Sequence, residues 1–385
     1  MGPHRSDLAI VLSGGGARAA YQVGFLRFLA REFPNLKPDI LTGVSAGAVN
    51  AAYLAAHPGG FRQKVEGLAE LWSGLRLEEV FRVDAPCLTL NVMRWGIRLV
   101  SGGSPGAPRV RSLVDTRPLR RLLERVLNAE DGRLVGIEQN LRHGAFKAVA
   151  LTASCYTTEQ SITWVQGDEI ASWERAHRKS VTSCLTVDHV MASSALPLFF
   201  PAAQVDGRWY GDGGIRLTAP LSPAVHLGAR RILAISSRYG RSLEEANHPL
   251  SSGYPPAAQV AGTLLNAIFL DLLDNDALRL HRINELIAAL PEDKRGSMRH
   301  VDLLVLRPSQ DLGALANEYE VKLPGAFRFL TRGLGTRETR SNDMLSLLMF
   351  QEAYLKRLVE LGEADARARA TEICRFLELR QAEAC

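Results

Sequence analysis

The pentapeptide Gly43-Val44-Ser45-Ala46-Gly47 has the residue types and spacing of a serine nucleophile. The short apolar run Ile40-Leu41 precedes it and a small-residue segment over 48–54 follows it, which predicts a strand, a sharp turn and a helix. The pattern has a steric basis, because small neighbours let strand, turn and helix approach closely around the serine. The pentapeptide also occurs by chance in unrelated proteins, so the motifs around it determine whether Ser45 is predicted to be a nucleophile.

An acyl-transfer site also needs a base that takes the serine proton. Asp212 is the candidate, because Gly213 and Gly214 follow it and allow a tight turn that presents the carboxylate without crowding. Asp206-Gly207 is a similar dipeptide that could be mistaken for it, and the second glycine favours Asp212. Asp212 is therefore expected within hydrogen-bond reach of the Ser45 hydroxyl.

The third requirement is a set of donors for the negative oxygen that develops in the reaction. Gly14, Gly15 and Gly16 lie between the apolar run Leu8–Leu12 and the start of a predicted helix, so their backbone N–H groups are candidates. In a parallel sheet, the loops after the first strand and after the Ser45 strand open on the same edge. The glycine loop and the serine are therefore expected to meet.

Strand and helix signals alternate along the chain, which predicts an α/β fold with a mostly parallel sheet covered on both faces. A helix is expected around Leu26, Leu29, Ala30 and Phe33, which have helical spacing. Further strands are expected over 146–154, 232–236 and 301–306, and further helices over 118–126, 263–287, 342–361 and 363–383. A boundary near residue 240 is expected, although the strand at 301–306 could rejoin the main sheet.

Composition bounds the class of protein. The 385 residues are 46% hydrophobic with a net charge of +5, which fits a globular chain. There is no interleaving of aromatic and basic residues, so nucleic-acid binding is not expected. No stretch approaches the ~18 apolar residues of a membrane span. Five scattered cysteines, without C-x-x-C spacing, favour a reducing, cytoplasmic compartment over a zinc site or a disulfide framework.

Taken together, these motifs resemble the patatin-like phospholipase family of lipid acyl hydrolases. The matching segments occur in the family's order over roughly residues 7–240. They are Ser13-Gly14-Gly15-Gly16-Ala17-Arg18-Ala19-Ala20-Tyr21-Gln22-Val23-Gly24, then Thr42 to Ala48, then 192–201, then Asp212-Gly213-Gly214, then 223–229. One departure is Ala19, where the family often has a glycine.

The resemblance implies a three-layer α/β/α sheet over residues 7–240, followed by a mainly helical region over 241–385. It implies a catalytic dyad of Ser45 and Asp212 without a histidine, and an oxyanion hole at Gly14–Gly16. Arg18 would help to order the glycine loop, or would be a surface salt-bridge partner only. Gly43, Gly47, Gly213 and Gly214 would have supporting roles. No metal ion or organic cofactor is implied.

The implied substrate is a phospholipid, a lysophospholipid or another lipid ester, with peripheral membrane contact and an oligomeric state left open. A non-catalytic lipid-binding or scaffolding relative is one alternative. A dinucleotide-binding protein is another, because Gly14 to Ala19 satisfies Gly-x-Gly-x-x-Ala. That interpretation also needs an acidic residue at the end of the next strand, where Ser45 stands; Asp39 falls at that strand's start.

Overall fold

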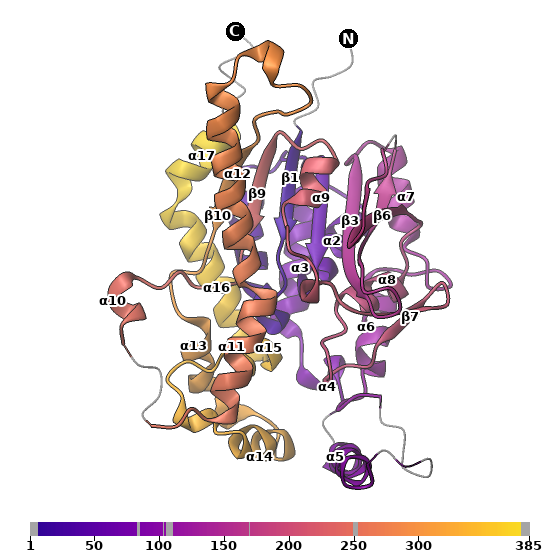
Figure 1. Ribbon diagram of the computed structural model, residues 1–385, viewed down its shortest axis with the longest axis vertical. Coiled ribbons are helices and arrows are strands. Elements are labelled where there is room, and N and C mark those ends of the chain that lie inside the picture. The colour runs from indigo at the N-terminus through magenta and orange to yellow at the C-terminus, as the bar shows by residue number, and fades with distance from the viewer. Residues whose placement is uncertain are drawn as a thin grey trace.

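The computed structural model describes residues 7–82, 85–102, 104, 111–168, 170–248 and 253–378, and a ten-stranded sheet lies at its centre (Figure 1). The strand order is β10-β9-β1-β2-β3-β4-β6-β5, and β8 pairs with β3 and β7. β10, β9, β1, β2 and β3 run parallel, which confirms the mostly parallel sheet. The strands are β1 (Leu8–Leu12), β2 (Ile40–Val44), β3 (Ala148–Cys155), β4 (Ser161–Gly167), β5 (Glu174–Arg175), β6 (Arg178–Thr182), β7 (Ala203–Val205), β8 (Arg208–Asp212), β9 (Arg231–Ile235) and β10 (Asp302–Leu306).

Helices cover both faces of the sheet, as the alternating side chains of β1 show. Leu8, Ile10 and Leu12 pack in one hydrophobic core with α1, α2, α3 and α16, whereas Ala9 and Val11 pack in a second core with α9 and α12. The three-layer α/β/α architecture is therefore confirmed. The helices are α1 (Ala19–Glu32), α2 (Ala46–Ala56), α3 (Phe61–Gly74), α4 (Leu77–Val80), α5 (Ala85–Val100), α6 (Arg117–Val126), α7 (Val135–Arg142), α8 (Val187–Ser193), α9 (Ser222–His226), α10 (Leu243–Ala246), α11 (Ala257–Phe269), α12 (Asp271–Ala289), α13 (Leu312–Tyr319), α14 (Gly325–Gly333), α15 (Asp343–Leu348), α16 (Glu352–Ala368) and α17 (Ala370–Glu378).

The long helices expected in the second half of the chain are interrupted in the structure. The expected helix over 263–287 is divided at Leu270 into α11 and α12, and the one over 342–361 is divided into α15 and α16. The expected final helix is also divided, since α16 ends at Ala368 and α17 follows; residues beyond 378 lie outside the described chain. These breaks contain neither glycine nor proline, so the local sequence carried no stop signal.

Residues beyond 240 pack closely against the elements that precede them. β10 extends the sheet beside β9, and α16 crosses α1 at a very short distance. A Cβ atom added to Gly24 would lie 1.9 Å from the Val359 carbonyl oxygen, and one added to Gly362 would lie 2.1 Å from that of Tyr21. Glycine is therefore required on both helices at this crossing. The division into units 7–240 and 241–385 remains a prediction.

Among the described residues, one helical stretch, 257–289, is long and apolar enough to cross a membrane by length and composition. It comprises α11 and α12, and its Phe269 and Leu273 are buried in the body of the protein. One such stretch is weak grounds for a membrane span, because core helices pass the same test.

Candidate active site

Ser45 lies on the sharp turn between β2 and α2 in a strained backbone conformation. Its φ of 57° and ψ of −132° are unusual for a residue with a side chain. A Cβ atom at Gly43 would lie 2.4 Å from the Gly47 carbonyl oxygen, and one at Gly47 would lie 2.3 Å from that of Leu12. Real Cβ atoms do not approach so closely, so both glycines are sterically required to form this turn.

Asp212 ends β8, and its side chain is completely buried. Antiparallel pairing with β3 sets Asp212 opposite Ala153, and a Cβ atom at Gly213 would lie 2.1 Å from the Thr152 carbonyl oxygen. The tight approach of the two strands therefore depends on glycine after Asp212. The Asp212 Oδ1 atom accepts a hydrogen bond from the Gly214 N–H at 2.9 Å.

Burial raises the pKa of Asp212 to about 7, against the lowering effect of the neighbouring Ser45 hydroxyl and of the hydrogen bond from the Gly214 amide. The Ser45 hydroxyl therefore lies near the carboxylate. The Oδ2 atom accepts no hydrogen bond from the described residues, which leaves it free to accept one from a hydroxyl. A carboxylate that titrates near neutral pH is suited to exchange a proton with an adjacent hydroxyl.

The glycine loop passes directly beside Ser45. A Cβ atom at Gly14 would lie 3.1 Å from Ser45 Cβ and 3.7 Å from its Oγ, so the loop backbone and the hydroxyl are neighbours. Gly15 has φ 146° and Gly16 has φ 54°, conformations that favour glycine. Within the described chain, the N–H groups of Gly14 and Gly15 donate to no protein acceptor, so both remain available to a ligand.

The carbonyl groups of this loop are held, and they set the direction of its amides. A trans peptide is planar, so the carbonyl of one residue fixes the N–H of the next. The Ser13 oxygen accepts from Gln22 Nε2 at 2.7 Å, which orients the Gly14 N–H. The Gly14 oxygen accepts from Ser237 Oγ at 2.5 Å, which orients the Gly15 N–H. The loop donors are thus fixed before any ligand arrives.

The contact between Gln22 and Ser13 belongs to a buried series of hydrogen bonds that joins three helices. Trp72 Nε1 donates to Asn50 Oδ1 at 2.7 Å, Asn50 Nδ2 donates to Gln22 Oε1 at 3.1 Å, and Gln22 reaches Ser13. Gln22 and Asn50 have no exposed surface. Ser193 has a similar role on the other side, since the Ser45 N–H donates to its Oγ at 3.1 Å. Gln22 and Ser193 lie within the segments 13–24 and 192–201, but their sequence pattern indicates no role for either side chain.

Arg18 is buried and is not a surface salt-bridge partner. Its side chain is 3% exposed, donates from Nε to Ser346 Oγ at 2.7 Å and pairs with Asp343 at 2.5 Å. Both partners lie on α15, and a Cβ atom at Gly16 would lie 2.1 Å from the Leu347 carbonyl oxygen. The α15 backbone therefore covers the outer side of the glycine loop. That cover leaves no space for a pyrophosphate at Gly16, which argues against the dinucleotide interpretation.

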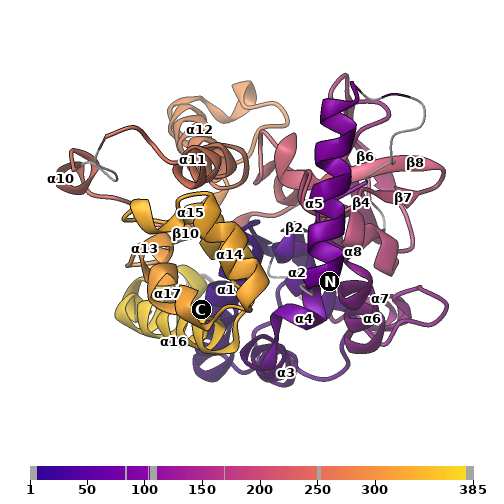
Figure 2. The ribbon, with the colours of Figure 1, turned by 90° about the horizontal axis from the view of Figure 1, so that it is seen from below.

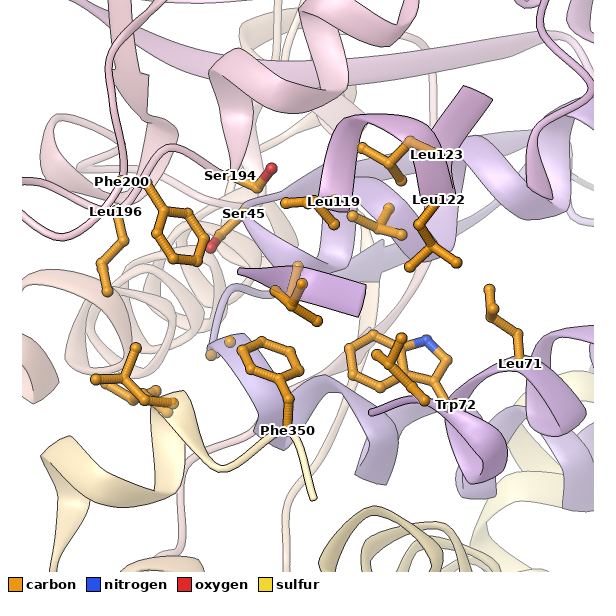
Figure 3. Close-up of a pocket in the computed structure, with 18 of the residues that line it drawn as sticks. Ser45, Leu71, Trp72, Leu119, Leu122, Leu123, Ser194, Leu196, Phe200 and Phe350 are labelled. Atoms are coloured by element: carbon orange, nitrogen blue, oxygen red, sulfur yellow. The ribbon is translucent and has the colours of Figure 1, made fainter. Parts of the chain in front are cut away.

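An apolar cavity opens beside Ser45. About 820 Å³ of space between its walls, the open mouth included, contains no protein atoms. Figure 3 shows Ser45, Leu196 and Phe200 on one side of the cavity and Leu71 and Trp72 on the other. Its walls come from α2, α3, α4, α6, α11 and α15, with Leu119, Leu122, Leu123, Phe269, Leu347 and Phe350 among them. A long hydrocarbon chain fits such a lining, and a polar cofactor does not.

The residues expected from the sequence thus lie together: the Ser45 turn, the buried Asp212 and the loop Gly14–Gly16 meet at one end of the apolar cavity. Asp206, the similar aspartate, instead forms the turn of the β7–β8 hairpin with φ 47°. Among the described residues, no group of three or more His, Cys, Asp or Glu side chains could hold a metal ion.

Comparison with known proteins gives a family and a set of distant structures. The model of the patatin-like phospholipase family matches residues 10–225. No curated protein sequence matches the chain. Human GIVD cytosolic phospholipase A2, solved in complex with methyl gamma-linolenyl fluorophosphonate, is 14% identical with a TM-score of 0.46; the alignment covers 98% of this chain and 60% of that one. VipD from Legionella pneumophila is also 14% identical, with a TM-score of 0.37 and coverage of 88% and 66%.

The chain spans less than two thirds of the length of the human protein. The family match rests on different grounds, because it covers more than half of this chain and includes the Ser45 turn, the glycine loop and Asp212. The chain belongs to the patatin-like phospholipase family, a family of lipid acyl hydrolases.

Proposed function

We propose that the protein hydrolyses fatty-acyl esters of phospholipids, lysophospholipids or related lipids, with Ser45 as the nucleophile and Asp212 as its base. The observation that carries the proposal is the position of a strained serine beside a buried carboxylate whose pKa is about 7, at the wall of an apolar cavity. The unpaired amides of Gly14 and Gly15 beside Ser45 support an oxyanion hole. Gly16, whose outer side lies under Leu347, would complete the loop.

In the first half of the reaction, the Ser45 oxygen bonds to the ester carbonyl carbon and its proton passes to Asp212. The carbonyl electron pair moves onto oxygen, where the Gly14 and Gly15 amides stabilise the negative charge. When the tetrahedral intermediate collapses, the bond to the glycerol oxygen breaks, and the leaving alcohol takes the proton from Asp212. An acyl-serine remains.

In the second half, a water molecule attacks the acyl carbon while Asp212 accepts its proton. The second tetrahedral intermediate collapses, the bond to Ser45 breaks, and the proton returns to the serine oxygen. The products are a fatty acid and the free enzyme. Because Asp212 alternates between base and acid, a pKa near neutrality serves both halves better than the usual value of 3.8.

The cavity supports a fatty-acyl group as the part of the substrate that lies deepest. Leu119, Leu122, Leu123 and Phe350 offer hydrocarbon surface and no charge. Burial of acyl methylene groups contributes about 0.8 kcal/mol for each one. The binding energy of a long chain would therefore place its ester carbon at Ser45, and the head group would lie toward solvent.

The proposal is tested by intact mass after treatment with a fluorophosphonate, which labels activated serines. We expect one adduct on the wild type and none on Ser45→Ala. Ser194→Ala is the matched control, since Ser194 also lines the cavity but its hydroxyl donates to the Val190 carbonyl at 2.7 Å. Labelling that persists in Ser45→Ala would contradict the assignment. A folded wild type that takes no label would favour the non-catalytic lipid-binding alternative.

A further inference from the structure

Helix α5 carries an exposed apolar stripe. Leu90, Met93, Ile97 and Val100 are 45%, 58%, 46% and 91% exposed. At 100° for each helical residue, these four positions fall within an arc of about 80°. Large side chains exposed in a contiguous row usually mark a surface that meets a partner or a membrane.

Arginines flank this stripe. Arg94 and Arg98 follow the stripe on one side of the helix, and neither forms a hydrogen bond or ion pair through its side chain within the described chain. The helix sequence contains no Asp or Glu. An apolar stripe bordered by arginines is the pattern of a helix that lies in the plane of a membrane surface, where arginines reach anionic head groups.

Helix α14 extends the same surface, and it contacts α5. Phe329 on α14 is 78% exposed and Val321, just before it, is 60% exposed. The α14 sequence also contains arginine and no acidic residue. Figure 1 shows α5 and α14 at the end of the molecule opposite both chain termini, and Figure 2, seen from that end, shows both facing the viewer.

This surface lies beyond the carboxyl edge of the sheet, the edge at which Ser45 follows β2 (Figure 1). A cluster of buried aromatic residues lies beneath this surface. Phe81, just after α4, contacts Phe327 of α14 with ring centroids 5.7 Å apart. Phe81 also contacts Phe200 at 5.8 Å and Phe350 at 6.4 Å, and both of these line the cavity. Helix α14, which carries part of the exposed surface, therefore packs against the wall of the cavity.

We propose that Leu90, Met93, Ile97, Val100, Val321 and Phe329, together with Arg94 and Arg98, form a docking face for an anionic phospholipid bilayer. The proposal rests on the proposed function, because a lipid ester must leave a bilayer to reach Ser45. Docking by this face would shorten the route of an acyl chain from the membrane into the cavity. Charge favours a bilayer over a second copy of this chain, since two such faces would bring arginines together.

The test measures cosedimentation of the full chain with vesicles of phosphatidylcholine alone or mixed equally with phosphatidylserine. The wild type should bind the mixed vesicles more tightly, and added salt should weaken that binding. Met93→Glu with Ile97→Glu should reduce binding about tenfold or more. Arg94→Glu with Arg98→Glu should remove the preference for phosphatidylserine.

The matched control is Leu278→Glu with Leu286→Glu on α12, whose side chains are 61% and 66% exposed outside the docking face. This control should bind vesicles like the wild type. Unchanged binding of Met93→Glu with Ile97→Glu, or equal losses in the control, would overturn the proposal. So would a concentration-dependent dimer of the wild type, seen by light scattering, that the Met93 and Ile97 substitutions abolish.

A soluble short-chain ester separates this proposal from the proposed function. Variants of the docking face should hydrolyse that ester at the wild-type rate but should lose activity on vesicles. Ser45→Ala should bind vesicles normally and hydrolyse neither substrate. Vesicle binding without any ester hydrolysis by the wild type would refute the proposed function and leave the docking face supported.

Discussion

Replacing Asp212 by asparagine should abolish hydrolysis and, at the same time, stabilise the fold in a pH-dependent way. The folded protein holds the proton of Asp212 up to about pH 7, whereas the unfolded chain releases it near 3.8. Between about pH 3.8 and about pH 7, the folded state therefore binds more protons than the unfolded state. The free energy of unfolding of the wild type therefore falls as pH rises through this window.

The magnitude follows from the shift. Roughly three pKa units at about 1.36 kcal/mol each give about 4 kcal/mol at pH 8, an upper value, and less than half of that at pH 5. Asparagine matches aspartate in shape, carries no charge, and keeps an oxygen for the Gly214 N–H. Its amide can also donate toward the Ser45 hydroxyl, so the variant loses only the strain of the buried charge.

The assay is denaturant unfolding of wild type and Asp212→Asn at about pH 4 and about pH 8. We expect the variant's advantage to be small at the lower pH and several kcal/mol at the higher one. Asp206→Asn removes the same charge from an exposed turn and should change stability by less than about 0.5 kcal/mol at both. An advantage of Asp212→Asn that is equal at the two pH values would refute the argument from desolvation.

Four further outcomes follow from the same geometry. With a soluble ester, kcat/KM should rise about tenfold for each pH unit below 7 and level above it, because Asp212 must be ionised; a rate flat from pH 5 to 8 would contradict this. Gly47→Ala should reduce kcat by about a hundredfold or more, since its Cβ would lie 2.3 Å from a carbonyl oxygen, whereas Gly74→Ala, which meets open space, should be neutral in the same assay. Asp343→Asn should lower the free energy of unfolding by about 2 kcal/mol in denaturant titrations and should lower kcat, because Arg18 would remain buried without its charge partner. Chelation of calcium should leave the hydrolysis rate unchanged, since neither the nucleophile nor the base acts through a metal ion; a rate lost with chelator and restored by calcium would disprove this.

The parts of the site that could be predicted from the sequence are those whose chemistry depends on near neighbours in the chain. The Ser45 turn is an example, because its two flanking glycines are required by backbone contacts within a strand-turn-helix unit. The glycine loop is another, since a strand, three glycines and a helix occur in succession. The alternation of strands and helices gave the parallel sheet for the same reason.

What the sequence could not supply depends on contacts between distant segments. Asp343 lies 325 residues from Arg18, and no spacing rule joins an arginine just before α1 to an aspartate at the start of a later helix. The sequence likewise could not predict that Leu347 and Phe350 line the cavity, because their apolar pattern is equally typical of a core helix. The breaks between α11 and α12 and between α15 and α16 result from tertiary packing rather than from local signals.

The hydrogen-bonded series Trp72–Asn50–Gln22–Ser13 connects the glycine loop to the cavity wall. An apolar core would pack well without Gln22 and Asn50, and buried polar groups stabilise a fold little unless every one is satisfied. Here the Gln22 and Asn50 side chains are both hydrogen-bonded, and the series ends at the Ser13 carbonyl oxygen. The Gly14 N–H lies in the same peptide plane as that carbonyl, so its direction is fixed too. The other end of the series is Trp72, whose ring forms part of the cavity wall. The wall that would hold the acyl chain and the donor that would hold the oxyanion are therefore parts of one rigid unit, so neither needs to reorganise when the ester carbon reaches Ser45.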